Sequence, residues 1–252
     1  MTFHTQARIP VPARLVLSGG RGRLDLSVRF GVLERPGKAP VLIDAGWPAR
    51  TPGEGPALWI YRTLLRPRVD PARSPVAVLR GASPGALLLS HLHADHLGPA
   101  RDLSDVPVHA SAQALAHARQ HPVQALRHGV MTSLLPDAVI DLAGDTVLPF
   151  GLGCGKDVLG DGSVYSVPLP GHADGHYGFL FPAFDPPVLY AADVQWVWPA
   201  IAEDRPPRGP ARAVYADARA AMESLARVRA FAAQGGCVVL CHDPAPVPDF
   251  ET

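Results

Sequence analysis

The stretch LLLSHLHADHLG, residues 87–98, places three histidines and one aspartate directly after a run of leucines. The leucine run is short and apolar, which predicts a fully buried strand that ends just before the first histidine. In the loop that follows, we expect His91 and His93 to project towards one point while Asp95 and His96 face a second point. Imidazole nitrogen and carboxylate oxygen are ligands that suit Zn²⁺ and related divalent ions. The stretch therefore predicts two metal sites.

Three further candidate ligands follow later apolar runs that read as strands. They are His172 in PLPGHADGH, Asp193 in LYAAD and His242 in VVLCHDP. A lone histidine is more often a surface or packed core residue than a metal ligand. The crowding in residues 91–96 favours metal binding, because a divalent cation offsets the cost of burying several polar groups together.

The patterning of the whole chain predicts alternating β and α segments. Strands are predicted at 15–18, 24–34, 41–46, 85–90, 106–111, within 139–170, and at 177–181, 187–193 and 237–241. Helices are predicted at 57–66, 112–120 and 211–233, the last from apolar positions that run from Val214 to Phe231. No repeat or long linker is present, so a single domain over residues 1–252 is expected. Two mixed sheets with helices outside, a four-layer α/β/β/α sandwich, fit this order, although the patterning alone leaves a three-layer α/β fold open.

Composition limits the partners and the compartment. The 252 residues are 47% hydrophobic, and 23 basic side chains balance 23 acidic ones. Without a cluster of lysine or arginine, we expect neither a nucleic acid nor a membrane surface as a partner. Three cysteines, an odd number, fit reduced thiols, and the N-terminus lacks an uninterrupted apolar signal segment. A cytoplasmic protein is therefore expected.

The motifs together resemble a known family. HLHADH matches the HxHxDH motif of the metallo-β-lactamase superfamily, and PGHADGH, AAD and CHD follow in the order of that superfamily. The stretch VLIDAG resembles the early strand that carries an aspartate in the same fold. Within the superfamily the chain is most similar to the branch of N-acyl homoserine lactone lactonases. The resemblance implies the four-layer fold, a metal-dependent hydrolase and a small-molecule ester, lactone or thioester substrate.

The resemblance also implies a ligand set for two divalent ions, with Zn²⁺ expected and Fe or Mn as alternatives. One ion would be held by His91, His93 and His172, the other by Asp95, His96 and His242, with Asp193 bridging both. Two such ions lower the pKa of a bridging water, and the resulting hydroxide attacks a carbonyl carbon. Asp95 would then also be catalytic, by taking a proton and returning it to the leaving group.

Other residues near the motifs are expected to support the ligands or the core rather than to bind metal. Asp44 either orients a ligand histidine through its second ring nitrogen or caps a turn as a buried aspartate. His176 is expected to be a structural hydrogen-bonder, and Cys241 a buried thiol. Four more histidines lie at no common ligand spacing and are expected in surface or packing roles: His109, His117, His121 and His128.

Trp196 stands three residues after the predicted bridging aspartate, where the lactonases resembled here usually have a tyrosine. An indole keeps one N–H donor, so Trp196 is a candidate substrate-binding residue, and the alternative is that it covers the edge of the core. The loop 203–212 carries three arginines and either binds an acidic substrate group or is solvated.

The leading functional hypothesis is a dinuclear metal-dependent hydrolase that acts on a lactone or another carboxylic ester. A thioesterase of the glyoxalase II kind shares the same ligands and remains an alternative. A hypothesis of another class is a catalytically silent, metal-stabilised binding protein. Phosphodiester hydrolysis is disfavoured because the chain lacks a basic surface. Redox chemistry is disfavoured because di-iron relatives usually have a glutamate in place of His93.

Overall fold

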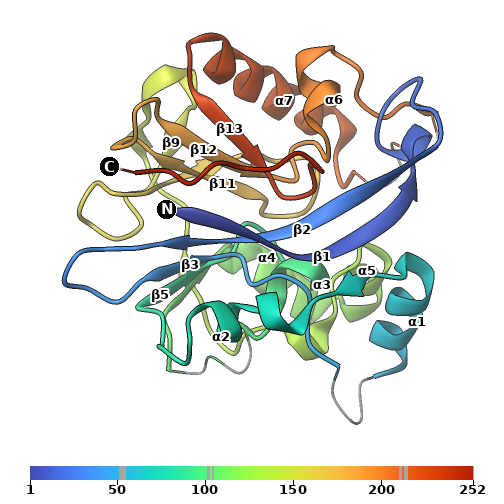
Figure 1. Ribbon diagram of the computed structural model, residues 1–252, viewed down its shortest axis with the longest axis horizontal. Helices are drawn as coiled ribbons and strands as arrows, with labels where there is room; N and C mark the ends of the chain where they lie inside the picture. The colour runs from blue at the N-terminus through green and yellow to red at the C-terminus, as the bar shows by residue number, and fades with distance from the viewer. Residues whose placement is uncertain (51–54, 101–102, 104, 210–211, 213–214, 252) are drawn as a thin grey trace. The chain divides into compact units, whose positions relative to one another are not determined.

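The computed structural model describes residues 1–50, 55–100, 103, 105–209, 212 and 215–251 (Figure 1). The chain forms two compact units. Unit 1 comprises Met1–Pro10 and Ser27–Asp141, and unit 2 comprises Val11–Leu26 and Leu142–Thr252. That both units belong to one domain over residues 1–252 stays a prediction.

Unit 1 is built on a seven-stranded mixed sheet. The strand order is β4-β1-β2-β3-β5-β6-β7, in which β1–β4 and β2–β3 are antiparallel pairs and β3, β5, β6 and β7 run parallel. The strands are β1 Thr2–Pro12, β2 Arg23–Leu33, β3 Val41–Ile43, β4 Arg68–Val69, β5 Ala86–Leu88, β6 Val108–Ala110 and β7 Ile140–Asp141. The described α-helices are α1 Pro56–Leu65, α2 Pro75–Val78, α3 Ala94–Leu97, α4 Ala112–Gln120 and α5 Pro122–Arg127, with short 3₁₀ turns at Pro71–Arg73 and Thr132–Leu134.

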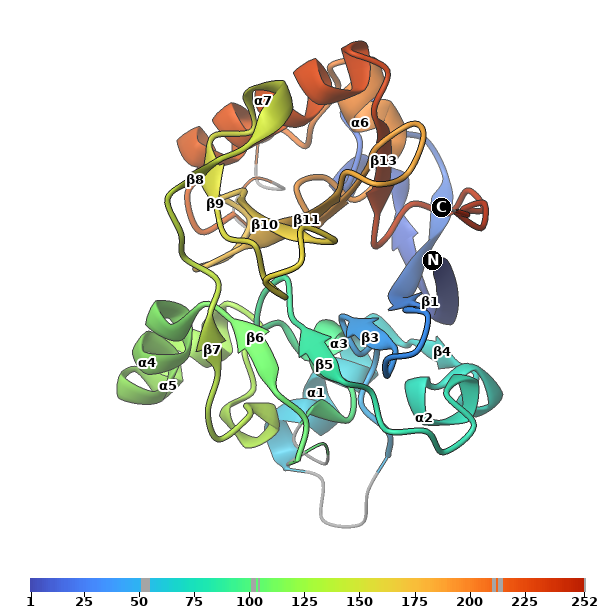
Figure 2. The same cartoon turned by 90° about the vertical axis from the view of Figure 1, so that its left-hand side faces the viewer.

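The core of unit 1 lies between the parallel strands and α4 (Figure 2). Leu87 and Leu89 from the β5 region pack in one cluster with Leu115 and Ala118 of α4. Each fully buried leucine of this kind stabilises the fold by about 1.5–3 kcal/mol. The stretch that carries the first candidate ligands therefore starts from a fully buried part of the sheet.

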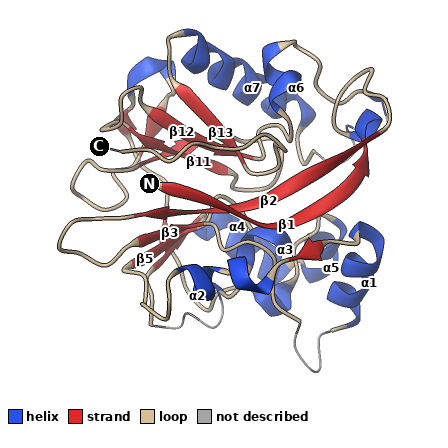
Figure 3. Ribbon diagram, viewed as in Figure 1, coloured by secondary structure: helices blue, strands red, loops and turns tan. Residues whose placement is uncertain are grey.

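Unit 2 is built on a four-stranded mixed sheet in the order β10-β11-β12-β13. The first three strands are antiparallel, whereas β12 and β13 are parallel. The elements of this unit are the 3₁₀ turn Ala13–Leu15, β8 Thr146–Val147, the 3₁₀ turn Pro149–Gly151, β9 Cys154–Gly155, β10 Tyr165–Pro168, β11 Tyr177–Phe181, β12 Val188–Ala192, α6 Trp198–Ala202, α7 Ala218–Ala233 and β13 Cys237–Leu240 (Figure 3).

Helix α7 covers the sheet of unit 2 with one apolar face. Leu225, Val228 and Phe231 are buried in a cluster with sheet residues such as Leu180 and Leu189. The helix begins at Ala218 because the Asp217 side chain accepts hydrogen bonds from two backbone N–H groups, at 2.8 and 3.0 Å. It ends before a glycine pair, as the sequence predicts.

Most of the predicted elements are confirmed, and three predictions are wrong. Helices 57–66 and 112–120 correspond to α1 and α4. The segment 15–18 is not a strand, because the chain turns there, and the first strand is instead β1. Most β1 residues are only partly buried, so they show no alternation of buried and exposed side chains that would predict a strand. The pairing of β1 with β2 and β4 defines it as a strand instead. Residues 94–97 form a short helix rather than a loop.

The third wrong prediction is the start of the last helix, because α7 begins seven residues later than residue 211. Its proposed apolar position Val214 lies outside the described residues. None of the three cysteines, all of which lie in the described part of the chain, forms a disulfide. None of the helices in the described part of the chain has the length and apolarity that a membrane span requires.

Candidate metal centre

The predicted ligands of unit 1 leave β5 and enter α3. His91 is buried after the strand, His93 is the residue that precedes the first turn of α3, and His96 lies in that turn. The His91 ring centroid lies 4.5 Å from that of His93 and 4.1 Å from that of His96. The structure therefore brings these three predicted histidines together within unit 1.

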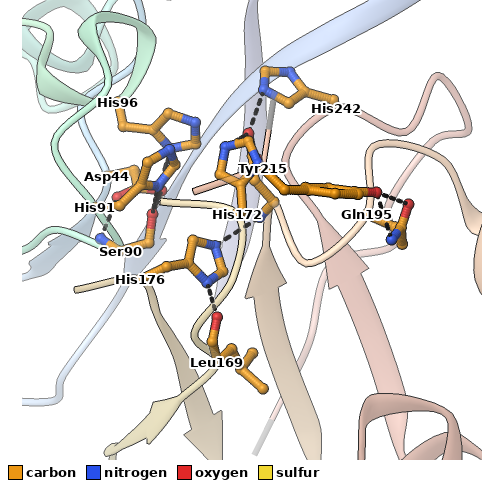
Figure 4. A network of polar contacts seen from close by, with 11 residues as sticks. Asp44, Ser90, His91, His96, Leu169, His172, His176, Gln195, Tyr215 and His242 are labelled. Atoms are coloured by element: carbon orange, nitrogen blue, oxygen red, sulfur yellow. Dashed lines mark hydrogen bonds and ion pairs between the residues drawn. The ribbon is translucent and has the colours of Figure 1, made fainter. Parts of the chain in front are cut away.

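Asp44 fixes the base of this histidine cluster (Figure 4). It follows β3 with a φ of 52°, and its side chain is fully buried. One carboxylate oxygen accepts the Ser90 backbone N–H at 2.7 Å. The other accepts the Ser90 hydroxyl at 2.8 Å and the His96 Nδ1–H at 2.7 Å. Asp44 thus binds the backbone and hydroxyl of Ser90 and also contacts His96, a predicted ligand, and its role in orienting a metal ligand stays a prediction.

These hydrogen bonds decide which nitrogen of each imidazole has a lone pair. Because the Asp44 carboxylate can only accept, His96 carries its proton on Nδ1 and presents Nε2 as a metal donor. The Ser90 hydroxyl donates to Asp44, so its oxygen accepts the Nδ1–H of His91 at 3.0 Å. His91 also presents Nε2. The sequence analysis missed Ser90, for which the only signal is its place directly before the first histidine.

Helix α3 is tied to the segment after Asp44 by two backbone hydrogen bonds. Ala45 N–H donates to the His96 carbonyl at 2.8 Å, and Gly98 N–H donates to the Gly46 carbonyl at 2.9 Å. Gly98 has a φ of 36°, and a Cβ there would lie 1.8 Å from the Ala45 carbonyl oxygen. Only glycine permits this close approach, which holds His96 over Asp44.

Asp95 is buried in the first turn of α3. Its carboxylate does not join the groups of donor atoms, among the described residues, that lie within 4.8 Å of one another. The structure thus places Asp95 beside His96 in sequence without showing it among the gathered donors. Its roles as a ligand and as a catalytic residue stay predictions.

In unit 2 the structure brings together His172, Asp193 and His242. Asp193 and His242 follow β12 and β13, and because these strands are parallel, both residues lie at the same edge of the sheet. One carboxylate oxygen of Asp193 lies 3.3 Å from Nε2 of His172 and 3.0 Å from Nε2 of His242. All three side chains are at least 95% buried.

Cys241 is fully buried, as predicted. Its sulfur also lies within 4.8 Å of donor atoms of Asp193 and His242. Alternate residues of a strand point to opposite faces, but this rule does not separate Cys241 from His242, because β13 ends at Leu240. The thiol is a neighbour of the predicted ligands.

His176 uses both ring nitrogens within unit 2 (Figure 4). Its Nδ1–H donates to the Leu169 carbonyl at 2.8 Å, and its Nε2 accepts the backbone N–H of Asp193 at 3.2 Å. The prediction of a structural hydrogen-bonder is confirmed. His176 also holds the backbone of the predicted bridging residue.

Trp196 is partly buried and lies between two rings of unit 2. Its ring centroid is 5.9 Å from that of His172, at an interplanar angle of 90°, and 6.4 Å from that of Tyr215, at 22°. The Tyr215 hydroxyl accepts from the Gln195 amide at 3.0 Å and donates to its carbonyl at 3.2 Å. Burial raises the pKa of Tyr215. The sequence analysis missed Gln195 and Tyr215.

The remaining candidates have local roles. His109 is buried in β6, and the rings of His117 and His121 contact each other in α4 and just after it. In the loop 203–212, Arg205 donates to the Ser18 carbonyl at 2.9 Å and pairs with a neighbouring glutamate. Residues 210–211 of that loop lie outside the described residues.

The donor chemistry of both units fits divalent metal ions. Unit 1 offers imidazole nitrogens whose tautomers are fixed by a carboxylate, and unit 2 offers two imidazoles around one buried carboxylate oxygen. Neutral imidazole and carboxylate are the donors of zinc and iron sites. His96 and His91 each have an acceptor on Nδ1, the Asp44 carboxylate and the Ser90 hydroxyl respectively, and such an acceptor on the second ring nitrogen is typical of histidines that bind metal.

Solved structures of low sequence identity share the fold. A mutant of B. thuringiensis AiiA, with N-decanoyl-L-homoserine bound at the active site, matches with a TM-score of 0.71 at 19% identity, over 99% of this chain and 97% of the other. The dizinc quorum-quenching lactonase AidC, in complex with a product of the acyl homoserine class, matches at 0.57 and 14%, over 91% and 79%. TTHA1623 in a di-iron-bound form matches at 0.51 and 22%, over 90% of each chain.

The sequence matches no curated protein. Residues 25–233 match the family model of the metallo-beta-lactamase superfamily. The predicted fold class and the predicted enzyme class, a metal-dependent hydrolase, are both confirmed at the level of this superfamily. A match over most of the sequence, together with the shared fold, shows that the chain belongs to the metallo-β-lactamase superfamily.

Proposed function

We propose that the chain is a dinuclear metal-dependent hydrolase that opens a lactone or cleaves another carboxylic ester. In this proposal two ions, with zinc as the expected metal, are held by His91, His93, Asp95, His96, His172, Asp193 and His242. The observation that carries the proposal is the Asp193 carboxylate oxygen with Nε2 of His172 at 3.3 Å and Nε2 of His242 at 3.0 Å.

That arrangement favours a cation for an electrostatic reason. Two imidazole nitrogens and a carboxylate oxygen lie in the protein interior, out of contact with bulk water. An uncompensated charge is costly in such an interior. A divalent ion at this place accepts lone pairs from all three groups and neutralises the carboxylate. The fixed Nε2 donors of His91 and His96 supply the same chemistry from unit 1.

Divalent ions held by these residues would supply two kinds of chemistry, the acidification of a water and the polarisation of a substrate carbonyl. The residues of the chain have separate tasks around that chemistry. Asp44 and Ser90 hold two imidazoles in the metal-binding tautomer. Asp95 accepts a proton during attack and returns it to the leaving group. The Trp196 indole N–H donates a hydrogen bond to a substrate oxygen.

The proposed substrate class is supported by what relatives of the same fold bind. AiiA and AidC were solved with acyl homoserines, which are the ring-opened products of lactones. The dizinc and di-iron forms of the relatives support a two-metal site and leave the native metal to measurement.

The test is proton release by the purified, zinc-reconstituted protein on a long-chain acyl homoserine lactone. We expect turnover that is lost in His93→Ala and kept in His117→Ala, a control histidine of α4 outside the ligand set. Turnover of thioesters alone would replace the lactonase proposal with a glyoxalase II-like thioesterase. Two bound metals with no turnover of esters, lactones or thioesters would support a silent metal-stabilised binding protein instead.

A further inference from the structure

Residues 193–198 of unit 2 connect the predicted bridging ligand to α6, and we name them the 193–198 segment. The segment contains no regular helix or strand before Trp198. Its backbone nevertheless has defined partners at both ends. His176 accepts the N–H of Asp193 at 3.2 Å, and the Asp243 carboxylate accepts the N–H of Trp198. Asp243 also accepts the Ala245 N–H at 2.8 Å, so it cannot swing away freely.

The middle of the segment is held by Tyr215. The amide of Gln195 and the hydroxyl of Tyr215 exchange two hydrogen bonds, at 3.0 and 3.2 Å, so one amide uses both the donor and the acceptor of that hydroxyl. Both side chains are buried, Gln195 to 99% and Tyr215 to 94%. Breaking this pair leaves polar atoms without partners in the interior, which makes it a strong constraint on geometry.

Tyr215 also contacts the next residue of the segment. Its ring lies nearly parallel to that of Trp196, with 6.4 Å between centroids and an interplanar angle of 22°. Trp196 in turn meets His172 at 90° and 5.9 Å. Both geometries are preferred arrangements of aromatic rings. A continuous series of contacts thus runs from Gln195 through Tyr215 and Trp196 to a predicted metal ligand.

We propose that Tyr215 is a positioning residue, which uses its hydrogen-bonded pair with Gln195 to hold Trp196 in place and thereby fixes the ring plane of His172. The proposal rests on the proposed function for the role of His172. It assigns no contact between the Tyr215 hydroxyl and substrate, because Gln195 occupies that hydroxyl. The Tyr215 phenol consequently positions Trp196 and does not bind substrate, and the donor offered to substrate is the indole N–H of Trp196.

The experiment compares three single variants and one double variant. Tyr215→Phe removes only the hydroxyl, Gln195→Met removes the amide and keeps both rings, Trp196→Phe removes the indole, and the double variant combines the first two changes. The matched control is Tyr165→Phe, which deletes a tyrosine hydroxyl in β10 of the same unit. Two readouts are taken: the near-UV circular dichroism of the metal-free protein, and zinc affinity by competition with a chromophoric chelator.

The first readout reports on Trp196 without any metal. We expect Tyr215→Phe and Gln195→Met to change the same near-UV band, and that band to be missing in Trp196→Phe. The double variant should change it no further than either single variant, because the two side chains act as one pair. The second readout should show zinc affinity about tenfold weaker in Tyr215→Phe and in Gln195→Met, the low end of the effect of partners outside the ligand set.

A purely structural role predicts a different result. In that case Tyr215→Phe lowers the midpoint of thermal unfolding but leaves the near-UV band and the zinc affinity within twofold of Tyr165→Phe, which would overturn the proposal. If Tyr215→Phe does not fold, Gln195→Met carries the same comparison. Failure of lactone hydrolysis counts against the proposed function alone, because the near-UV readout requires neither metal nor substrate.

Discussion

Replacing Asp44 by asparagine is the most informative single change in unit 1. The carboxylate accepts three hydrogen bonds, at 2.7, 2.8 and 2.7 Å, one on one oxygen and two on the other. Asparagine is nearly the same size and keeps the acceptor for the Ser90 backbone N–H. Its NH₂ group then faces the Ser90 hydroxyl and His96 Nδ1, where acceptors were needed. His96 must accept from that NH₂ and carry its own proton on Nε2, the nitrogen that would bind metal.

The size of the effect can be bounded from these contacts. Two hydrogen bonds to a charged acceptor are lost, each of which contributes about 1.5–3 kcal/mol. Their sum, ~3–6 kcal/mol, is an upper limit for the loss of folding stability in Asp44→Asn, because the Ser90 hydroxyl can rotate towards the new amide. The effect on metal affinity is a separate quantity. Loss of a partner outside the ligand set typically weakens metal binding by ~10–100-fold. We expect Asp44→Asn to fall in that range, equivalent to about 1.4–2.8 kcal/mol.

The assay is a competition titration of zinc against a chromophoric chelator, with circular dichroism to confirm that the variant folds. Asp70→Asn is the matched control, because Asp70 is an exposed carboxylate of the same unit that caps a 3₁₀ turn and pairs with Arg73 at 3.7 Å. Ser90→Ala should give a smaller loss, since it removes the acceptor of His91 Nδ1 but keeps the 2.7 Å hydrogen bond between His96 and Asp44. Zinc affinity of Asp44→Asn within twofold of Asp70→Asn would refute the reasoning.

Three further changes test packing and protonation. Gly98→Ala places a Cβ 1.8 Å from a backbone oxygen and should destabilise unit 1 by ~2 kcal/mol or more in urea unfolding, whereas Gly55→Ala, with open space, should not. Phe231→Ala should lower the free energy of unfolding by about 3–5 kcal/mol, and a loss under about 1 kcal/mol would show that α7 is not packed as described. Burial raises the pKa of the Cys237 thiol, so this thiol stays protonated at neutral pH. Cys237 should therefore react with iodoacetamide more slowly than exposed Cys154. The rate of reaction at Cys237 should rise as the pH passes the raised pKa. Peptide mass spectrometry showing Cys237 labelled first would contradict that expectation.

The sequence predicted the elements that strong periodicity defines. Such elements coincide with apolar runs that glycine, proline or polar residues bound, and they are α1, α4 and the buried strands β5, β12 and β13. β1 was not predicted because partners elsewhere in the chain stabilise it, and its own residues are mostly half-buried. The start of α7 was misplaced because apolar spacing continues N-terminal to Asp217, whereas the cap at that residue decides where the helix begins.

The residues of the candidate site also fall into two groups, those that short sequence motifs predict and those that only the tertiary fold brings to the site. The predicted histidines and Asp193 occur in short motifs, and within each unit the structure brings most of them together. Ser90 and Tyr215 were missed because their partners lie 46 and 20 residues away in the sequence. Such contacts depend on the tertiary fold, which no local pattern encodes. Asp44 was identified only because the family resemblance drew attention to its strand.

The central claim is that this chain binds two divalent ions through the predicted ligands. The most direct measurement is the metal content of the protein after reconstitution with excess zinc and desalting, by inductively coupled plasma mass spectrometry. We expect two zinc ions per chain, kept in the His117→Ala control and reduced in Asp193→Ala, which removes the proposed bridging carboxylate. A wild-type chain that retains no zinc, or an Asp193→Ala variant that retains both ions, would contradict it.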